Sequence, residues 1–96
     1  MKETVKQNKI SVITVVYNSV SNIKETLDSF VAQTWPNKEL IVIDGGSTDG
    51  TVDIINEYPG DIAFWCSEPD GGIYDAMNKG IDKATGEWIT FLNSGD

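Results

Sequence analysis

The sequence predicts an α/β fold with a mainly parallel sheet and helices on both of its faces. Four short segments are apolar and rich in β-branched residues, and three segments with helical spacing lie between them. Turns rich in Gly, Asp and Asn separate many of these segments. Strands that alternate with helices are connected by right-handed crossovers, which make the strands parallel. The expected order of elements is therefore β-α-β-α-β-α-β.

The first half of the chain is expected to form two buried strands joined by a helix. Residues 10–17 (ISVITVVY) are nearly all apolar, as in a strand that is buried on both faces. Residues 22–34 follow, with Asn22 as the N-cap and Glu25 completing a capping box. The apolar residues of this helix share one face: Ile23, Leu27, Phe30 and Val31. Residues 39–43 (ELIVI) are the second buried strand.

The second half of the chain repeats this alternation. A turn at residues 44–50 opens a short helix, and residues 62–66 (IAFWC) are the third strand. A third helix follows Gly72, and residues 88–92 (WITFL) are the fourth strand. The expected buried faces are Val52, Ile55 and Tyr58 in the short helix, and Ile73, Met77, Gly80, Ile81 and Ala84 in the third. The tryptophans are expected to pack in the core: Trp35, Trp65 and Trp88.

Composition limits the domain count and the classes of partner. The 96 residues suffice for one domain, expected over residues 10–96 after a polar arm at residues 1–9. Seven Lys, no Arg and fifteen acidic residues give a net charge of −8. This sign argues against nucleic acid or an anionic membrane as a partner.

Missing residue types exclude several chemistries. Without His, the chain has no imidazole base and no His metal ligand. The single cysteine, Cys66, forms no internal disulfide and is expected to be an inert buried thiol in a reducing, cytoplasmic setting. No apolar run approaches the roughly 20 residues of a membrane-spanning helix.

Polar loops follow the expected strands at one edge of the sheet. Ligands of open parallel sheets bind outside the carboxyl ends of the strands. Tyr17 and Asn18 follow the first strand, residues 44–50 the second and residues 93–96 the fourth. A dinucleotide fingerprint, a phosphate-binding P-loop and a calcium loop are all absent from these positions. The topology therefore predicts a ligand site at this edge without assigning its chemistry.

Each candidate residue has a structural alternative. Asp44 can accept hydrogen bonds from a base or ribose, or cap its own turn through the N–H groups of Gly46 or Ser47. Tyr17 can stack on a nucleobase or pack at the rim of the core. For Asp49 we favour helix capping over ligand contact.

The remaining acidic residues lie near the third helix and at the last strand. Asp70 is expected to cap the third helix, whereas Asp75 faces either the site or water, with water favoured. Asp96 suits a hard cation such as Mg²⁺ or Mn²⁺, although an ordinary exposed Asp is the simpler interpretation of the residue alone.

Five strings in order resemble the family 2 glycosyltransferases, inverting enzymes with the Rossmann-like GT-A fold. These strings are S-V-I-T-V-V-Y-N, S-F-V-A-Q-T-W-P-N-K-E-L-I-V-I-D, D-G-G-S-T-D-G-T, D-G-G-I-Y-D-A-M-N-K-G-I and G-E-W-I-T-F-L-N-S-G-D. The resemblance covers residues 10–96 and extends to the colanic-acid-type polysaccharide transferases. It implies a nucleotide-diphosphate sugar donor, a divalent cation (Mg or Mn) on the diphosphate, and transfer to a glycan or lipid-linked acceptor hydroxyl with inversion, in polysaccharide biosynthesis.

The resemblance also implies roles for individual residues. The implied donor contacts are Tyr17, Asn18, Asp44, Gly45, Asp75 and Ser94. Gly45 stands where the family has a second Asp that contacts the base, and Met77 where it has Arg. Asn93 and Gly95 replace the carboxylates of the family's D-x-D motif, which leaves Asp96 as the metal ligand.

The catalytic base and the acceptor half are expected downstream of Asp96. The chain is therefore expected to be the N-terminal, donor-binding part of a cytoplasmic or peripheral inner-face membrane enzyme, and inactive alone. An open sheet edge would favour self-association. The residues also leave open a non-catalytic α/β nucleotide-binding or signalling module, and a hydrolase that uses Asp44 and Asp96 as a carboxylate pair on glycans.

Overall fold

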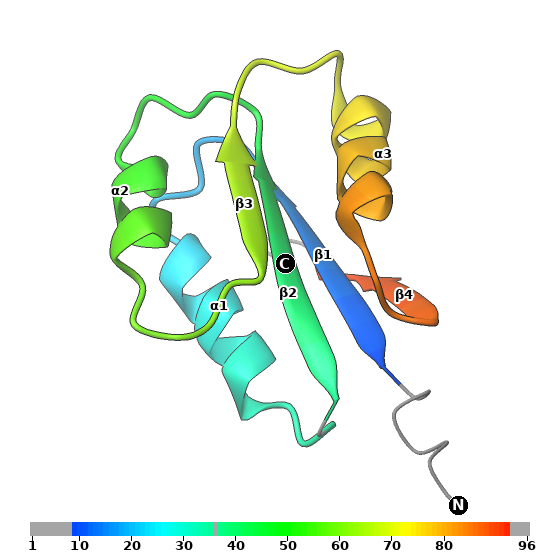
Figure 1. The fold of residues 1–96 in the computed structure, drawn as a ribbon. Coiled ribbons are helices and arrows are strands. Elements are labelled where there is room, and N and C mark those ends of the chain that lie inside the picture. Colours follow the sequence, from blue (N-terminus) through cyan, green and yellow to red (C-terminus); the bar gives the residue numbers. More distant parts are fainter. Residues whose placement is uncertain (1–8, 36, 93–96) are drawn as a thin grey trace, which may run out of the picture.

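The computed structural model describes residues 9–35 and 37–92 (Figure 1). The described residues form seven elements in the expected order, which confirms the α/β prediction. These are β1 (Ile10–Val16), α1 (Ile23–Ala32), β2 (Lys38–Asp44), α2 (Thr51–Glu57), β3 (Phe64–Ser67), α3 (Ile73–Lys83) and β4 (Trp88–Phe91).

The four strands form one parallel sheet in the order β3-β2-β1-β4. Helices α1 and α2 cover one face, and α3 covers the other (Figure 1). The chain crosses to the far side of β1 only after β3, through α3. The loop after β1 and the loop after β2 therefore lie side by side, and the loop before α3 approaches them from the opposite face.

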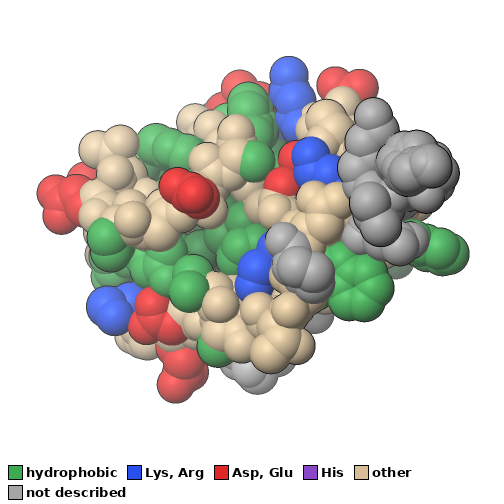
Figure 2. Space-filling model, turned by 60° about the horizontal axis from the view of Figure 1, so that its bottom comes forward, with side chains coloured by type: hydrophobic (Ala, Val, Ile, Leu, Met, Phe, Trp, Pro, Cys, Tyr) green, Lys and Arg blue, Asp and Glu red, His purple; other side chains and the backbone are tan. Residues whose placement is uncertain are grey.

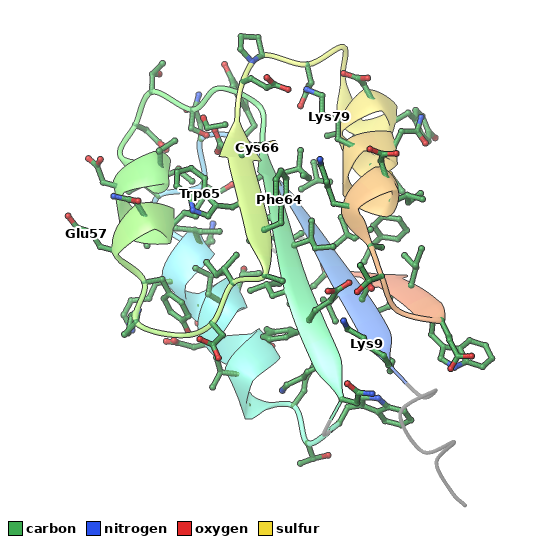
Figure 3. The ribbon with its side chains drawn as sticks, in the orientation of Figure 1. Lys9, Glu57, Phe64, Trp65, Cys66 and Lys79 are labelled. Atoms are coloured by element: carbon green, nitrogen blue, oxygen red, sulfur yellow. The ribbon has the colours of Figure 1, made fainter. Side chains whose placement is uncertain are left out.

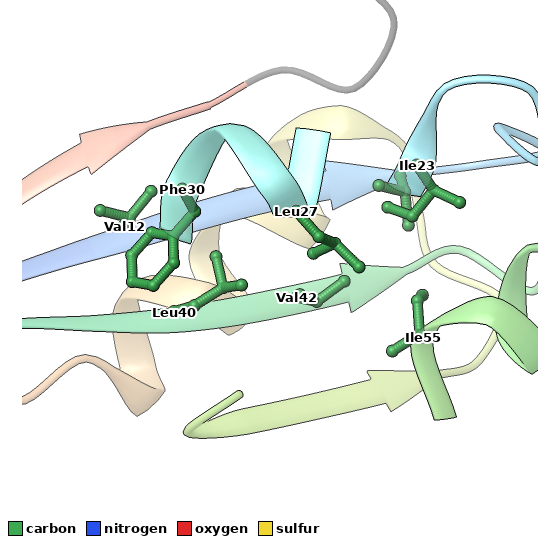
Figure 4. Close-up of a cluster of buried hydrophobic side chains, with 8 residues drawn as sticks. Val12, Ile23, Leu27, Phe30, Leu40, Val42 and Ile55 are labelled. Atoms are coloured by element: carbon green, nitrogen blue, oxygen red, sulfur yellow. The ribbon is translucent and has the colours of Figure 1, made fainter. Parts of the chain in front are cut away.

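The larger core lies between the sheet and helices α1 and α2 (Figure 4). Alternate residues of β1 and β2 point to this side, as the two-residue repeat of a strand requires. The buried cluster comprises Val12, Val16, Leu40 and Val42 from the strands, Ile23, Leu27 and Phe30 from α1, and Ile55 from α2. Three of the four apolar residues predicted for the inner face of α1 are therefore buried, whereas the fourth, Val31, is 54% exposed.

A smaller core lies under α3, and here the predicted helix face was partly wrong: Gly80 is buried and Ala84 packs on this core as predicted, but two of its isoleucines are not buried. The buried residues of α3 are Ala76 and Gly80, whereas Ile73 and Ile81 are exposed. A Cβ added at Gly80 would lie 2.5 Å from Cγ2 of Ile13 in β1. The helix therefore rests against the sheet on its small residues, because larger ones would hold the two layers apart.

Two further predictions were wrong. Asn22 makes no side-chain cap hydrogen bond, and its backbone (φ −123°, ψ −15°) is outside the extended region that N-cap residues usually adopt. Trp35 and Trp88 are 43% and 62% exposed.

Neighbouring residues of β3 point to opposite faces of the sheet. Trp65 packs against the larger core, as predicted, while Phe64 and Cys66 lie on the α3 side (Figure 3).

A polar cluster joins the amino-terminal ends of β1 and β2 to the turn before β4. The buried Ser11 hydroxyl donates to the Glu39 carboxylate (2.6 Å) and accepts the N–H of Gly86 (2.8 Å). Glu39 also accepts the N–H of Thr85 (2.7 Å) and pairs with Lys9 (3.2 Å). Figure 2, which brings this end of the molecule forward, shows lysine and acidic side chains next to each other.

Strand β4 lies at the edge of the sheet and is exposed along its whole length. Its apolar side chains Trp88, Ile89 and Phe91 are 62%, 42% and 39% exposed. In the part of the chain that the structure describes, no helix has the length and apolar character needed to cross a membrane.

Candidate functional site

A cavity of about 470 Å³ lies at the carboxyl end of the sheet, beside the start of α3. Its walls come from the end of β1 with Tyr17, from Gly45 after β2, from the loop before α3 with Asp70, and from Ile73 and Ala76 of α3 itself. This is the edge that the topology predicts for a ligand. The floor is mainly apolar, and the polar groups come from loops.

Asp44 ends β2 but does not line this cavity. Its carboxylate is fully buried and accepts four hydrogen bonds. The N–H groups of Gly46 and Ser47 donate to Oδ2 (3.0 and 2.8 Å), which accepts the Ser67 hydroxyl as well (2.8 Å). The Ser47 hydroxyl donates to Oδ1 (2.6 Å). The turn capping that we offered as the alternative for Asp44 is therefore present.

The loop after β1 is fastened to the loop after β2 by reciprocal contacts. The N–H of Asn18 donates to Oγ of Ser47 (2.7 Å), and Oδ1 of Asn18 accepts the N–H of Thr48 (2.9 Å). Asn18 has φ 48°, a left-handed conformation that Asn tolerates better than most residues. Through Ser47, this loop also depends on the Asp44 carboxylate.

Asp49 holds the two loops together at their far end. Its Oδ1 accepts the N–H and the hydroxyl of Thr51, and its Oδ2 accepts the N–H of Val20 (3.2 Å). The Thr51 hydroxyl in turn accepts the N–H of Ser19 (2.9 Å). The hydrogen bond from the Thr51 side chain is the main cause that lowers the pKa of Asp49. Asp49 therefore has the structural role that we favoured for it.

Tyr17, Gly45 and Asp70 meet at the mouth of the cavity. Tyr17 is 62% exposed and forms part of the wall. A Cβ added at Gly45 would lie 3.1 Å from Oδ2 of Asp70 and 3.4 Å from Cδ1 of Tyr17. The Asp70 carboxylate therefore stands beside the space that a side chain at position 45 would fill.

Asp75 lies on the exposed side of α3 and is not among the residues that line the cavity. Its carboxylate accepts the N–H of Gly71 (2.9 Å) and lies 3.9 Å from Lys79. Lys79 also pairs with Glu68 (3.1 Å), and this contact is the main cause that raises the pKa of Lys79 (Figure 3). The favoured interpretation of Asp75, which faces water, matches this geometry.

Ser94 and Asp96 lie outside the described residues. Within residues 9–35 and 37–92, no three Cys, Asp or Glu side chains are grouped so as to hold a metal ion. Cys66 is half-buried, and burial is the main cause that raises the pKa of its thiol, which is typical of an unreactive cysteine.

Hydroxyl groups that organise these loops were not predicted from the sequence. Ser67, and the side-chain roles of Ser47 and Thr51, were not predicted. One signal was available: Asp44 follows a buried apolar strand, and a buried carboxylate requires donors nearby. The distance of Ser67 along the chain concealed it, since β3 pairs with β2 only in the folded sheet.

Comparison with known proteins identifies close relatives. An uncharacterized glycosyltransferase of Mycobacterium tuberculosis (strain ATCC 25618 / H37Rv) is 46% identical over 88 residues, which are 91% of this chain and 34% of the relative. A PGL/p-HBAD biosynthesis glycosyltransferase of Mycobacterium bovis (strain BCG / Pasteur 1173P2) is 42% identical over 89 residues, or 90% of this chain and 35% of the relative. The chain thus spans about a third of the length of these curated relatives.

Two solved structures share the fold. Staphylococcus aureus TarS 1–349, solved with UDP-GlcNAc, has a TM-score of 0.77 and 32% identity, covering 88% of this chain and 26% of TarS. The mannosyltransferase PcManGT from Pyrobaculum calidifontis, solved with GDP-Man and Mn²⁺, has a TM-score of 0.80 and 32% identity, with the same coverage of the two chains. The fold is therefore the Rossmann-like N-terminal half of a GT-A domain. The profile described as "Glycosyl transferase family 2" matches residues 11–96, and the chain belongs to that family.

Proposed function

We propose that this chain forms the donor-binding part of an inverting glycosyltransferase that acts in glycan biosynthesis. The donor would be a nucleotide-diphosphate sugar, and the sugar would pass to an acceptor hydroxyl. The observation that carries this proposal is the cavity at the carboxyl end of the sheet, in a chain that is 32% identical to TarS and PcManGT, which were solved with UDP-GlcNAc and GDP-Man.

The cavity suits the nucleoside part of such a donor. Its volume of about 470 Å³ lies in the range of small-molecule sites. Val15, Ile73 and Ala76 supply apolar surface, Tyr17 supplies an aromatic face, and Asp70 supplies a hydrogen-bond acceptor. A planar, partly polar base matches this combination better than a bare sugar does.

A divalent cation would complete the site. The described residues that line the cavity include neither Lys nor Arg, and the chain has a net charge of −8. A diphosphate therefore needs another source of positive charge near this chain, and PcManGT was solved with Mn²⁺ as well as its donor. We assign its binding to Asp96, the ligand that the family resemblance implies; no three of the described Cys, Asp and Glu side chains are grouped so as to hold a metal ion. When bound, it would neutralise the diphosphate that leaves with the nucleotide.

The base that deprotonates the acceptor is also assigned to a position beyond Asp96. The relatives are about three times as long as this chain, so room for an acceptor half exists in proteins of this family. We place the reaction in the cytoplasm, an assignment that the half-buried free thiol of Cys66 supports.

The carboxylate-pair hydrolase is disfavoured by the position of Asp44. Such enzymes need two carboxyl groups that both reach the scissile bond. The Asp44 carboxylate is fully buried and accepts four hydrogen bonds, so it cannot contact a glycan in this conformation. The non-catalytic signalling module has no comparable support, since the relatives carry glycosyltransferase names.

Calorimetric titration with UDP and GDP, with and without Mn²⁺, tests the proposal. We expect one of the two nucleotides to bind in the presence of Mn²⁺, with an affinity that falls at least about tenfold in Asp96→Ala. Asp82→Ala, which changes an exposed residue of α3, is the control and should bind like the unmodified chain. The absence of nucleotide binding under all conditions would contradict the donor-binding role.

A further inference from the structure

The carboxylate of Asp70 takes the space that the missing side chain of Gly45 leaves at the cavity. The two residues come from different loops, one after β2 and one between β3 and α3. Oδ2 of Asp70 lies 3.1 Å from the position that a Cβ at Gly45 would have, which is closer than nearly all Cβ contacts. Gly45 does not adopt a positive φ, so its backbone would accept a side chain if the space were free. A side chain at position 45 would therefore require the Asp70 carboxylate to move by a few tenths of an ångström.

The two oxygens of Asp70 are used differently. Oδ1 accepts the N–H of Gly72 (3.0 Å), and this bond fixes the side chain against its own loop. Oδ2 accepts no hydrogen bond from the described residues and faces the region of Gly45 and Tyr17 at the cavity. A half-buried carboxylate oxygen without a protein donor is available to a ligand.

Charge limits which part of a nucleotide this oxygen can contact. A carboxylate repels phosphate groups and accepts only from N–H or O–H donors. Cδ1 of Tyr17 lies 3.4 Å from the position that a Cβ at Gly45 would have, so the Tyr17 ring borders the same space as Oδ2 of Asp70. A flat ring placed in this space would contact both Tyr17 and Asp70. This arrangement favours the base over the ribose and the diphosphate.

We propose that Oδ2 of Asp70 accepts a hydrogen bond from a ring N–H of the donor nucleobase, such as N3–H of uracil or N1–H of guanine, while the Tyr17 ring packs beside the base. The base would then be selected by the carboxylate of Asp70, from the loop before α3. In the family resemblance, this contact comes from an Asp at the position of Gly45. This inference rests on the proposed donor-binding function.

Methylated nucleotides test the contact without altering the protein. UDP and GDP are titrated with Mn²⁺ beside N3-methyl-UDP and N1-methyl-GDP, on the unmodified chain and on Asp70→Ser. Serine is too short to reach the base but retains an oxygen for the N–H of Gly72. For whichever parent nucleotide binds, methylation should weaken binding to the unmodified chain at least about tenfold and should have little effect on Asp70→Ser. Asp82→Ala should respond to methylation as the unmodified chain does.

The outcomes separate this inference from the proposed function. Suppose that the unmodified chain binds UDP or GDP. If Asp70→Ser binds that nucleotide equally well, or if methylation of the nucleotide weakens its binding to Asp70→Ser as much as to the unmodified chain, the role of Asp70 is wrong and the donor-binding role stands. If neither UDP nor GDP binds the unmodified chain, the proposed function itself fails.

A second measurement tests the shared space without any ligand. Gly45→Asp should lower the melting temperature, because the new side chain meets Asp70 at 3.1 Å and adds a like charge. In the Asp70→Ser background, the same substitution should cost less. An equal loss in both backgrounds would show that the two positions do not compete for one space.

Discussion

At the scale of single residues, Asp44 shows how a buried carboxylate can organise a site without touching its ligand. Side chains alternate along a strand, so Asp44 shares the α1 and α2 side with Val42, while Gly45 borders the cavity. The hydrogen-bond donors to the Asp44 carboxylate come from the turn that follows it and from the end of β3. Ser47 extends this hydrogen-bond network to Asn18 after β1. The Asp44 carboxylate thus fixes the loop after β1, the loop after β2 and the end of β3 relative to one another, as preorganisation of a binding site requires.

Asp44→Asn is expected to destabilise the chain by about 2 to 3 kcal/mol. The substitution replaces a charged acceptor with a neutral amide, whose own N–H donors would face the N–H and O–H donors that bind Asp44. Urea unfolding followed by tryptophan fluorescence measures this loss. Asp82→Asn, at an exposed site on α3, is the matched control and should stay within about 0.5 kcal/mol of the unmodified chain. A comparably small loss for Asp44→Asn would mean that the loops do not depend on this carboxylate.

At the scale of elements, small residues and polar clusters decide how the helices and strands meet. Helix α3 lies close to β1 because Ala76 and Gly80 form its inner surface. At the other end of the sheet, Glu39 joins β2 to β1 through Ser11 and to the turn before β4 through Thr85. These contacts align the three strands from the end opposite the cavity.

Glu39 makes the stability of the chain depend on acidic pH. Burial by itself raises the pKa of Glu39, but hydrogen bonds from Ser11, Thr85 and Lys9 outweigh it and lower the pKa from 4.5 to about 2. A carboxylate with a depressed folded pKa stabilises the fold above its unfolded pKa, and that stability is lost as pH falls toward the folded pKa. The contribution of Glu39 should therefore be complete at neutral pH and decline between pH 4.5 and about 2.

Glu39→Gln should consequently lower stability at pH 7 by about 2 kcal/mol and flatten the pH dependence in this acidic window. Urea unfolding at a series of pH values measures both effects. Glu57→Gln, on the exposed side of α2, serves as the control with an unchanged profile. If Glu39→Gln keeps the full acid sensitivity of the unmodified chain, other carboxylates are responsible for it.

At the scale of the whole molecule, the sheet is covered unevenly. Helices protect β1 and β2 on both faces, whereas β4 lies at an edge with Trp88, Ile89 and Phe91 exposed. An open edge strand with apolar side chains on it is a known route to association. Self-association stays a prediction, and β4 is the surface that we expect to mediate it.

Sedimentation velocity over a range of concentrations should show association of this chain. Ile89→Lys should reduce it, because it places a charge on the open strand. Val31→Lys changes an apolar residue on α1 that is 54% exposed and should leave association unchanged. An equal effect of both substitutions would point to general solubility and not to the β4 edge.

The order and type of all seven elements could be predicted from the sequence, because strand and helix periodicities depend on neighbouring residues. Prediction was weaker wherever a partner lies far along the chain. Gly80 was predicted on the inner face of α3, but Ile73 and Ile81 were wrongly placed there and Ala76 was missed. Ile13, which requires small residues opposite it, is 67 positions from Gly80 in the sequence. A cavity does lie at the edge where the topology predicts a ligand, but Asp70, which borders that cavity, was predicted from the sequence only as a helix cap.

Sequence alone was thus enough for the elements, their parallel arrangement, the edge of the sheet that carries the cavity, and the family resemblance that the comparisons confirmed. The folded structure was needed to decide which carboxylate is buried and which borders the cavity. Asp44 and Asp70 both follow strands as polar residues in Gly-rich turns. Ser67 of β3 donates to the buried Asp44 carboxylate, whereas Asp70 borders the cavity beside Gly45. Both contacts join segments that are far apart in the sequence, so they exist only in the folded chain.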